Sequence, residues 1–359
     1  MNMKIEFQIY KTEWWLRGYL FLQAEVAKFL TYYCGSPSCL NLRNVVLLNS
    51  CCAVFSALGM FLCDPGDAIL VLTPFHNVFL FSAQMYAQVE LIPIHVDSQI
   101  TNTNTQTFQL TMGKVEQALL EAKTKSKKIN GLLLANPQNP LGGVNVESLK
   151  EYLKFAKRNE LHVVIDETYM LSMFDETIIF HSVLSLEILP DPSRTHVIWG
   201  IKDFGITGFC FGILYIHNDD VVSAMSPFGY LHSVSGISQY KLLYLPTNHS
   251  RLQEVYVYVT KMLHELEEQY EFKITFFSHG CGLYIWINLK KLLDPCTFKE
   301  ELVLHCGFLD HKLILSLGKS YRFKEPGWFF LMFAKNSQLL REAMDRFGQA
   351  IEEQKPEKN

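Results

Sequence analysis

The sequence predicts an α/β fold, in which a large, doubly wound and mostly parallel sheet is followed by a smaller α+β region. As far as Gly212, short apolar runs typical of buried strands alternate with helical segments, which is the rhythm of parallel βαβ units. Beyond that point the helices and strands are grouped instead. At 359 residues the chain also exceeds the length at which a single core stops growing, so a second, smaller domain is expected.

The stretch from Val45 to Cys63 allows two interpretations. It carries no charged residue and approaches the length of a membrane span. Asn49 and Ser50 interrupt it, however, and both are good N-cap residues for a helix. We therefore expect a strand over 45–48, a polar turn and a buried helix to Leu62, and no membrane segment.

The remaining elements follow from the same periodicities. Before Gly212, strands are expected at 68–73, 89–96, 131–135, 161–165 and 196–198, and helices at 14–30, 111–122 (with Thr111 as N-cap) and 146–159. After it, helices are expected at 248–269 and 338–353, a hairpin at 273–277 and 283–288, and strands at 313–317 and 328–333. The expected domains are a shortened N-terminal segment 1–30, a large domain 31–221 and a small domain 222–359.

Composition narrows the class of protein. A net charge of −4 without a Lys/Arg-rich patch suits a globular protein that does not bind nucleic acid. The nine cysteines are odd in number and scattered, and none are spaced as C-x-x-C. This pattern is typical of reduced thiols, so we expect a cytoplasmic protein with no metal site. The first residues carry charges throughout, unlike a secretory signal.

Three polar residues each lie just after a predicted strand: Asn139, Asp166 and Lys202. In a doubly wound sheet, ligands bind beyond the carboxyl ends of the strands, so these residues can converge. Lys202 lies among apolar residues and glycines, which favour a neutral, nucleophilic amine able to form Schiff bases with carbonyl compounds. Taken singly, a solvent-facing lysine in a turn and an aspartate that caps a turn are open alternatives. Together, the three residues are what a pyridoxal phosphate (PLP) site requires.

Five sequence motifs carry a family resemblance. They are D-P-G-D-A-I-L-V-L-T-P-F, N-P-Q-N-P-L-G-G, V-V-I-D-E-T-Y-M, K-D-F-G-I-T-G-F and K-E-P-G-W-F, in this order along the chain. The chain resembles the fold-type I PLP-dependent aminotransferases (class I/II), in particular their 1-aminocyclopropane-1-carboxylate (ACC) synthase branch and its animal ACC synthase-like proteins. The resemblance implies a large PLP-binding domain with a mostly parallel sheet, a smaller α+β C-terminal domain, and a homodimer.

The resemblance also implies roles for the residues at the strand ends. Lys202 would be the catalytic Schiff-base lysine, and Asp166 would pair with the pyridine nitrogen of the cofactor. Tyr169 and Asn139 would donate hydrogen bonds to its phenolate oxygen.

A second group of residues would hold the phosphate and the ring face. The backbone amides of Cys51 and Cys52 would meet the phosphate at the start of a helix. The aromatic residue that stacks on the ring would be Phe75 or His76, and the second position suits stacking better.

Departures from the family pattern weaken the expected activity. Cys210 stands where the family has an arginine for the phosphate, and Trp199, Gly200 and Ile201 stand where it has serines. Phe330 stands where the family has the arginine that binds the substrate carboxylate. The region near 238–246 also looks short.

The nearby Arg322 is the alternative residue for the substrate carboxylate. Two functions therefore remain open. The first is a PLP-dependent, transaminase-like enzyme acting weakly on amino acids, with lowered cofactor affinity. The second is a pseudoenzyme that keeps the dimeric fold as a binding or interaction module. ACC synthesis itself is not expected.

Overall fold

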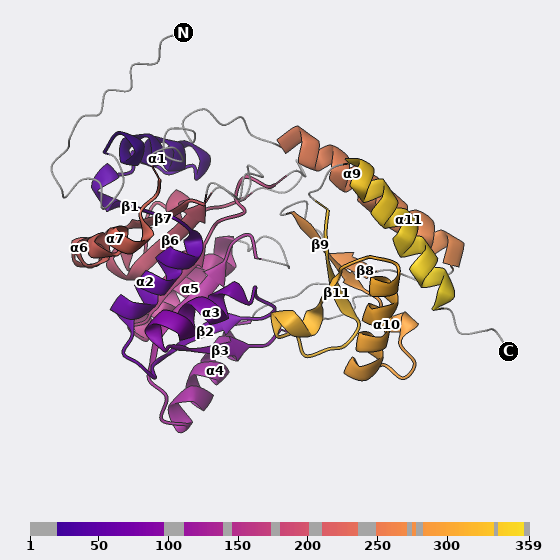
Figure 1. Ribbon diagram of the computed structural model, residues 1–359. Coiled ribbons are helices and arrows are strands. Elements are labelled where there is room, and N and C mark those ends of the chain that lie inside the picture. Colours follow the sequence, from indigo (N-terminus) through magenta and orange to yellow (C-terminus); the bar gives the residue numbers. More distant parts are fainter. Residues whose placement is uncertain are drawn as a thin grey trace, which may run out of the picture.

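The computed structural model describes residues 20–96, 111–138, 146–173, 180–200, 210–235, 249–270, 275–277, 283–333 and 337–354. Figure 1 shows two lobes. The large lobe contains a seven-stranded sheet and is formed by the first part of the chain, and the small lobe contains a four-stranded sheet and is formed by the last part.

The large-lobe sheet has the strand order β1-β7-β6-β5-β4-β2-β3. Its strands are β1 Val45–Leu48, β2 Ala68–Leu72, β3 Glu90–Ile94, β4 Ile129–Ala135, β5 His162–Asp166, β6 Thr195–Gly200 and β7 Gly212–Ile216. The pairings from β3 through β2, β4 and β5 to β6 are parallel, and β7 runs antiparallel to both β6 and β1. The expected mostly parallel α/β sheet is confirmed. The reversed strand β7 was not predicted.

Helices cover both faces of this sheet, which explains its nearly continuous apolar strands. They are α1 Leu20–Tyr33, α2 Cys51–Leu62, α3 Val78–Ser82, α4 Met112–Thr124, α5 Val146–Arg158, α6 Asp219–Met225 and α7 Gly229–His232. Alternate residues of β1 pack on opposite faces: Val45 and Leu47 join the cluster that contains α1 and α5, and Val46 and Leu48 join the cluster that contains α2. The strand–turn–helix interpretation of 45–62 is thereby confirmed.

Two helix starts were predicted from capping residues, with different outcomes. Ser50 caps α2, because its hydroxyl accepts a hydrogen bond from the Ala53 N–H at 3.0 Å. Thr111 is the N-cap residue of α4, as predicted, but its side chain makes no capping hydrogen bond. The N–H of Lys114, which the hydroxyl would have bonded, is already donated to the Thr111 carbonyl at 3.0 Å.

The small lobe is built on an antiparallel sheet in the order β10-β11-β9-β8. Its strands are β8 Thr275–Phe277, β9 Tyr284–Asn288, β10 Ser316–Leu317 and β11 Trp328–Met332, and its helices are α9 His249–Tyr270, α10 Phe298–Asp310 and α11 Ser337–Glu353. The predicted hairpin is confirmed as β8 and β9. Helix α10 was not predicted.

The small lobe packs against the carboxyl edge of the large sheet. Because β2, β4, β5 and β6 run in the same direction, their carboxyl ends lie along this one edge. The Tyr284 hydroxyl reaches the carbonyl of Gln138 at 3.5 Å, and the Phe75 N–H donates to the carbonyl of Tyr321 at 3.2 Å. Among the described helices, none is both long and apolar enough to cross a membrane.

Candidate functional site

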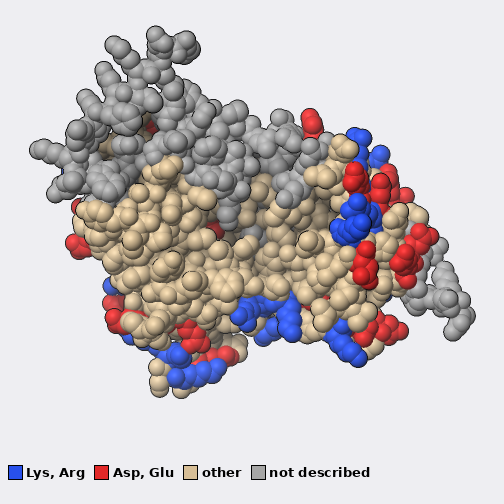
Figure 2. All heavy atoms as spheres, viewed as in Figure 1, with Lys and Arg blue, Asp and Glu red and all other residues tan. Residues whose placement is uncertain are grey.

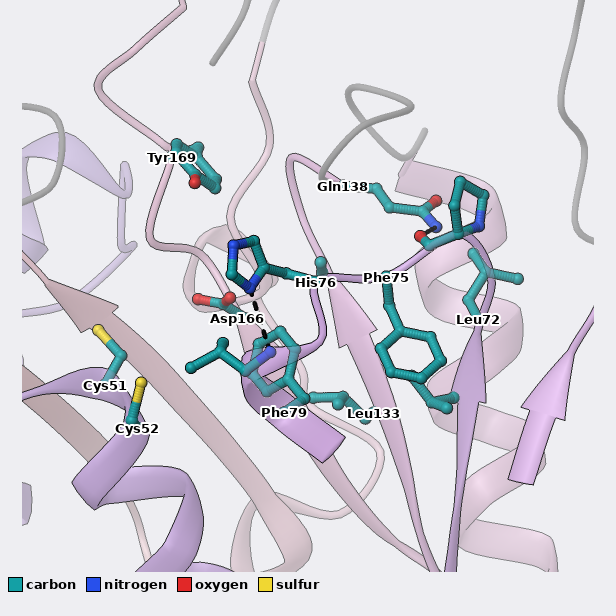
Figure 3. Close-up of a pocket in the computed structure, with 14 residues that line it drawn as sticks. Cys51, Cys52, Leu72, Phe75, His76, Phe79, Leu133, Gln138, Asp166 and Tyr169 are labelled. Atoms are coloured by element: carbon teal, nitrogen blue, oxygen red, sulfur yellow. Dashed lines mark hydrogen bonds between the residues drawn. The ribbon is translucent and has the colours of Figure 1, made fainter. Parts of the chain in front are cut away.

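A cavity lies at the carboxyl edge of the large sheet (Figure 3). The loop after β2 brings Phe75 and His76 to it, the segment after β4 brings Gln138, and β5 ends in it with Asp166. Asn139 and Lys202 lie outside the described residues. The described residues nearest to them in sequence are Gln138 and Gly200, the last residue of β6.

Asp166 is the last residue of β5 and is only 8% exposed. Its carboxylate accepts hydrogen bonds from the Thr168 N–H, at 3.1 Å, and from the Thr168 hydroxyl. The carboxylate thus caps its own turn, which was the structural alternative to a cofactor-binding role for Asp166. The carboxylate also lines the cavity, as a cofactor-binding role requires. The two roles are compatible, because a carboxylate can accept several hydrogen bonds.

Tyr169 and His76 also line the cavity, from different parts of the chain. The Tyr169 ring is buried and lies edge-to-face with Tyr284, with ring centroids 5.4 Å apart. His76 Nδ1 accepts a hydrogen bond from the Val78 N–H at 3.2 Å, so the neutral ring carries its proton on Nε2 (Figure 3). Phe75 and His76 both reach the cavity, and the structure leaves the choice of stacking residue between them open.

The first turn of α2 closes another side of the cavity with Cys51 and Cys52. The Cys51 thiol donates to the Trp199 carbonyl, with the sulfur 3.4 Å from the oxygen, and the same sulfur lies 3.6 Å from the Thr168 hydroxyl oxygen. The amino end of a helix carries a partial positive charge and favours an anion. The expected phosphate end of the site is therefore next to Asp166 and Tyr169.

Two glycines allow α2 to begin this close to the sheet. Gly200 and Gly212 are paired across β6 and β7. A Cβ atom on Gly212 would lie 2.3 Å from the Ser50 carbonyl carbon, and one on Gly200 would lie 2.5 Å from Cys51 Sγ. Any side chain at Gly212 would thus displace the turn that starts α2. Cys210, two residues before Gly212, is exposed and has a positive φ of 36°.

Phe330 lies in β11 of the small lobe and faces the large lobe. In β9 and β11 the odd residues, such as Phe329, enter the small-lobe core, and four even residues join the core cluster shared with the large sheet: Tyr284, Trp286, Trp328 and Phe330. Phe330 is stacked between Tyr284 and Tyr321, with ring centroids 4.8 and 4.9 Å away. We call Tyr284, Tyr321 and Phe330 the aromatic roof. Arg322 follows Tyr321 in the left-handed region at φ 59° and is exposed.

Glu167 points away from the cavity and into the core, although it follows Asp166 directly. It is 0% exposed and accepts from the Ser182 hydroxyl at 2.5 Å and the Val183 N–H at 2.8 Å. Burial raises the pKa of Glu167 to about 7, although these hydrogen bonds lower it. Of these two neighbouring carboxylates, only Asp166 lines the cavity.

Sequence reasoning missed four residues that shape the site. Thr168 and Gln138 lie inside the quoted motifs and had a signal in the motif itself. Tyr284 and Tyr321 carried no such signal in the sequence, because each is an ordinary aromatic residue among apolar and polar neighbours. Among the described residues, no group of three or more His, Cys, Asp or Glu side chains is placed to hold a metal ion.

The residues at the cavity fit the cofactor that the motifs imply. A carboxylate, a tyrosine, a flat ring and a helix amino end surround one space, and these groups match the ring nitrogen, phenolate oxygen, ring face and phosphate of PLP. The protein atoms that would hold the ring end all come from the large lobe. In the small lobe, the aromatic roof contacts the cavity lining through the ring of Tyr284 against Tyr169 and the ring of Tyr321 against His76.

Comparison with known proteins agrees with this geometry. A family model described as aminotransferase class I and II matches residues 15–347. The chain is 58% identical over 353 residues to the human "Probable inactive 1-aminocyclopropane-1-carboxylate synthase-like protein 2", covering 94% of this chain and 61% of that protein. It is 45% identical over 352 residues to the Bos taurus "1-aminocyclopropane-1-carboxylate synthase-like protein 1", covering 94% and 69%. The chain thus spans about three fifths of the human relative.

A solved structure shares the fold. The aspartate aminotransferase of Thermotoga maritima matches 96% of this chain and 84% of its own, with a TM-score of 0.77 and 21% sequence identity. At that identity the similarity establishes the fold alone, and it confirms the fold-type I architecture. The resemblance inferred from the motifs is also confirmed, and the chain belongs to the class I and II aminotransferase family, together with the ACC synthase-like proteins.

Proposed function

We propose that this protein binds PLP through a Schiff base on Lys202 and is a transaminase-like protein with weak or absent turnover of amino acids. The observation that carries the proposal is the single cavity that gathers Asp166, Tyr169, His76 and the start of α2. The family is generally PLP-dependent, which supports the choice of cofactor. The scattered free thiols support a cytoplasmic location.

Each described residue has a chemical task in this proposal. The Asp166 carboxylate holds a proton on the pyridine nitrogen, and the Tyr169 hydroxyl donates to the phenolate oxygen. The N–H groups of Cys51 and Cys52 bind the phosphate, and His76 or Phe75 covers the ring face. When bound, PLP supplies an electron sink for carbanion chemistry. Asn139 and Lys202 have their roles from the motifs alone.

The affinity for PLP is proposed to be lower than is typical of the family. Cys210 replaces a phosphate arginine, and a hydrogen bond to a charged group is worth about 1.5–3 kcal/mol. Its loss corresponds to a roughly ten- to hundredfold weaker complex. The residues 199–201, in place of serines, add to this loss.

Chemical labelling of Lys202 tests the proposal. Purified protein mixed with PLP should develop visible absorbance, and borohydride should fix the cofactor on Lys202, identified by peptide mass spectrometry. Lys202→Ala should remove both signals, whereas Lys299→Ala, at an exposed position on α10, should change neither. Equal labelling of surface lysines, or an unchanged Lys202→Ala variant, would contradict the proposal.

The second candidate is a pseudoenzyme that keeps the fold as a binding module. The packing of Phe330 between two tyrosines favours it, because a buried aromatic ring stands at the position where the family pattern has the arginine for the substrate carboxylate. The printed name of the human relative, "probable inactive", points the same way for that protein. Bound PLP without transamination of any amino acid would support this candidate.

We also propose a homodimer. The large lobe exposes apolar side chains on neighbouring elements: Met60, Phe61, Phe81, Met85, Tyr86, Tyr230 and Leu231. Ring contacts link these elements, with Phe61 5.9 Å from Phe228 and Tyr86 6.0 Å from His232. On the face shown in Figure 2, charged residues gather over the small lobe and along one rim of the large lobe, and the surface between is largely uncharged. Sedimentation should show a dimer at micromolar concentration, and a folded monomer would contradict it.

A further inference from the structure

A second cavity lies where the two lobes meet, next to the candidate cofactor site. Its volume is about 340 Å³, which is far more than the roughly 15 Å³ that one water molecule needs and lies within the range of small-molecule sites. Among the described lining residues, only His76 also lines the first cavity. The second cavity is therefore a separate space that adjoins the first at one side chain.

Both lobes contribute walls to the second cavity. His76 and Asn77 lie between β2 and α3 of the large lobe (Figure 1). The small lobe contributes His305 from α10, together with residues 314–317 and 320–321 from β10 and the segments beside it. The edge-to-face contact of His76 with Tyr321, at 5.9 Å between ring centroids, joins the two walls.

Each wall carries one buried polar atom that has no hydrogen-bond partner in the protein. These atoms are Asn77 Oδ1 in the large lobe and His305 Nδ1 in the small lobe. Asn77 is the N-cap residue of α3, but its side chain makes no capping hydrogen bond. An unpaired buried polar atom destabilises the native state, and such atoms are rare in folded proteins. Packing alone therefore does not account for Asn77 and His305.

Both side chains can reach a ligand through a small movement. Asn77 Oδ1 and His305 Nδ1 are covered by protein in this conformation. Rotation about χ2, a soft torsion in both residue types, would turn each atom toward the cavity that its residue lines. Neither atom would lose a hydrogen bond by this rotation, because neither has one. A ligand would thus gain two hydrogen bonds without breaking existing ones at these atoms.

The polar residues of the lining indicate the class of ligand. Asp, Glu, Lys and Arg are absent from the described lining, which favours a neutral ligand. Asn77 Oδ1 can only accept a hydrogen bond, whereas His305 Nδ1 donates or accepts according to its tautomer. Ser316 and Ser320 also line the cavity, and their hydroxyls do both. Hydroxyl groups on the ligand satisfy every one of these partners, because a hydroxyl both donates and accepts.

The rest of the lining is suited to a carbon ring. Ile314, Leu315 and Leu317 line the cavity together with Tyr321. Cyclic polyols and sugars present C–H groups beside their hydroxyls, and C–H groups pack favourably on aliphatic and aromatic side chains. A ligand with both kinds of surface matches the mixed lining better than a purely polar or a purely apolar one.

We infer that this cavity is a second binding site, which takes a neutral cyclic polyol or a monosaccharide whose hydroxyls pair with Asn77 and His305. The inference goes beyond the proposed PLP site and does not depend on it. In the protein without this ligand the two unpaired atoms lower stability. Asn77 and His305 therefore serve binding at the expense of stability, as residues of functional sites commonly do.

Substitutions that remove the unpaired atoms give the first test. Asn77→Leu and His305→Phe keep roughly the size of each side chain and replace its polar atoms by apolar ones. In ligand-free protein, each variant should leave the urea midpoint unchanged or raise it. Asn130→Leu is the matched control and should lower the midpoint, because the Asn130 amide donates to the Leu62 carbonyl at 3.0 Å and to Asp67 Oδ2 at 2.6 Å. A loss in Asn77→Leu or His305→Phe as large as that in the control would overturn the inference.

Ligand binding gives the second test, with D-glucose and myo-inositol as probes. Saturation-transfer NMR should detect saturable binding of at least one probe to wild type, and that probe should raise the melting temperature. Sugars also stabilise proteins by exclusion from their surface, so the variants are compared at equal probe concentration. Affinity should fall roughly tenfold in Asn77→Leu and in His305→Phe, the value of one hydrogen bond, and should persist in Asn130→Leu.

Three results of the binding test would overturn the inference. They are the absence of saturable binding of either probe to wild type, equal binding by wild type and both cavity variants, and binding of the anion D-gluconate as tight as that of D-glucose. The purified full chain is used with and without added PLP, and the outcome should be the same. Visible absorbance on adding PLP reports on the proposed function alone, so the two proposals can fail independently.

Discussion

The large-lobe residues that line the cavity and the small-lobe rings that pack on them are positioned by different physical means. The large-lobe side is positioned by the backbone, since β2, β4 and β5 are parallel and deliver His76, Gln138 and Asp166 to one edge. The small-lobe side is positioned by ring packing on one face of an antiparallel sheet. Residues at strand ends keep their positions as long as the sheet folds. The side chains of the roof can be substituted without changing the sheet that carries them.

The hydrogen bonds of the two sides show the same contrast. At the large-lobe edge, the Asn136 N–H donates to the Asp166 carbonyl and the Glu167 N–H to the Ile198 carbonyl, both at 2.8 Å. These backbone hydrogen bonds position Asp166 and its neighbours independently of the side chains. A described polar contact from the roof to the cavity lining is that of the Tyr284 hydroxyl with the Gln138 carbonyl. Its other described side-chain contacts there are between rings.

The largest expected effect is on stability, from removing the centre of the roof. Phe330→Ala should lower the free energy of unfolding by about 3–5 kcal/mol, the usual loss for truncating a buried phenylalanine. Urea titration measures it, with Leu302→Ala, at an exposed position on α10, as the control near zero. PLP absorbance should survive, because the ring end of the site belongs to the large lobe. Its loss would mean that the two sides are not separable.

The next effect is on cofactor affinity, at the large-lobe side. Asp166→Asn keeps the size of the side chain but removes the charge that would hold the pyridine proton. PLP should bind roughly ten- to hundredfold more weakly, the value of one charged hydrogen bond. Glu167→Gln is the matched control, since this neighbouring carboxylate faces the core. Equal losses in both variants would show that Asp166 acts through the fold and not on the cofactor.

The sequence predicted the elements whose signal is local. Ser50 as a helix cap, the apolar strands and the strand-end position of Asp166 each depend on a few adjacent residues, and each was found. Strand β7 was missed because its apolar run, Gly212–Ile216, follows the glycine-rich motif directly and looked like part of that loop. Helix α10 was missed although Thr297 caps it by accepting from the Glu300 N–H.

The roof could not be predicted, because it depends on sheet register. Phe330 lies opposite Trp286 in the pairing of β11 with β9, which sets Tyr284 diagonally beside it on the same face. Tyr321 comes from a separate turn before β11. A shift of one residue in this register would send all even positions into the small-lobe core instead. The sequence identified Phe330 as an unusual residue, but the partners that give it a role come from tertiary packing.

A smaller effect tests the phosphate end of the large-lobe side. Cys210 is exposed and lies two residues before Gly212, which packs on the start of α2. Cys210→Arg should tighten PLP by about tenfold through a charged hydrogen bond to the phosphate. Fluorescence titration measures the affinity, with Cys296→Arg, at another exposed thiol, as the control. If Cys210→Arg did not raise the affinity for PLP, the phosphate would not bind near residue 210.

The last effect concerns pH, and it contrasts the two ends of the large sheet. At the amino ends of β5 and β6, His162 Nδ1 and His196 Nε2 lie 2.9 Å apart. Burial lowers the pKa of both groups, with Arg194 lowering that of His162 further. The unfolded chain therefore takes up protons below about pH 6.5 that the native state refuses, and stability falls as the pH falls.

Glu167, at the carboxyl end, acts in the opposite direction. Its pKa is raised from 4.5 to about 7, so the native state binds a proton that the unfolded state lacks between these values. Its contribution is present below pH 4.5 and is lost as the pH rises through about 7, which partly offsets the histidines in acid. Glu167→Gln removes this offset, so its unfolding free energy should fall more steeply than that of wild type below about pH 6.5, by roughly 1 kcal/mol per pH unit. Urea titrations at several pH values, with the exposed Glu187→Gln as control, measure the difference in slope. Parallel profiles for Glu167→Gln and wild type would show that Glu167 is already ionised in the folded protein, despite its full burial.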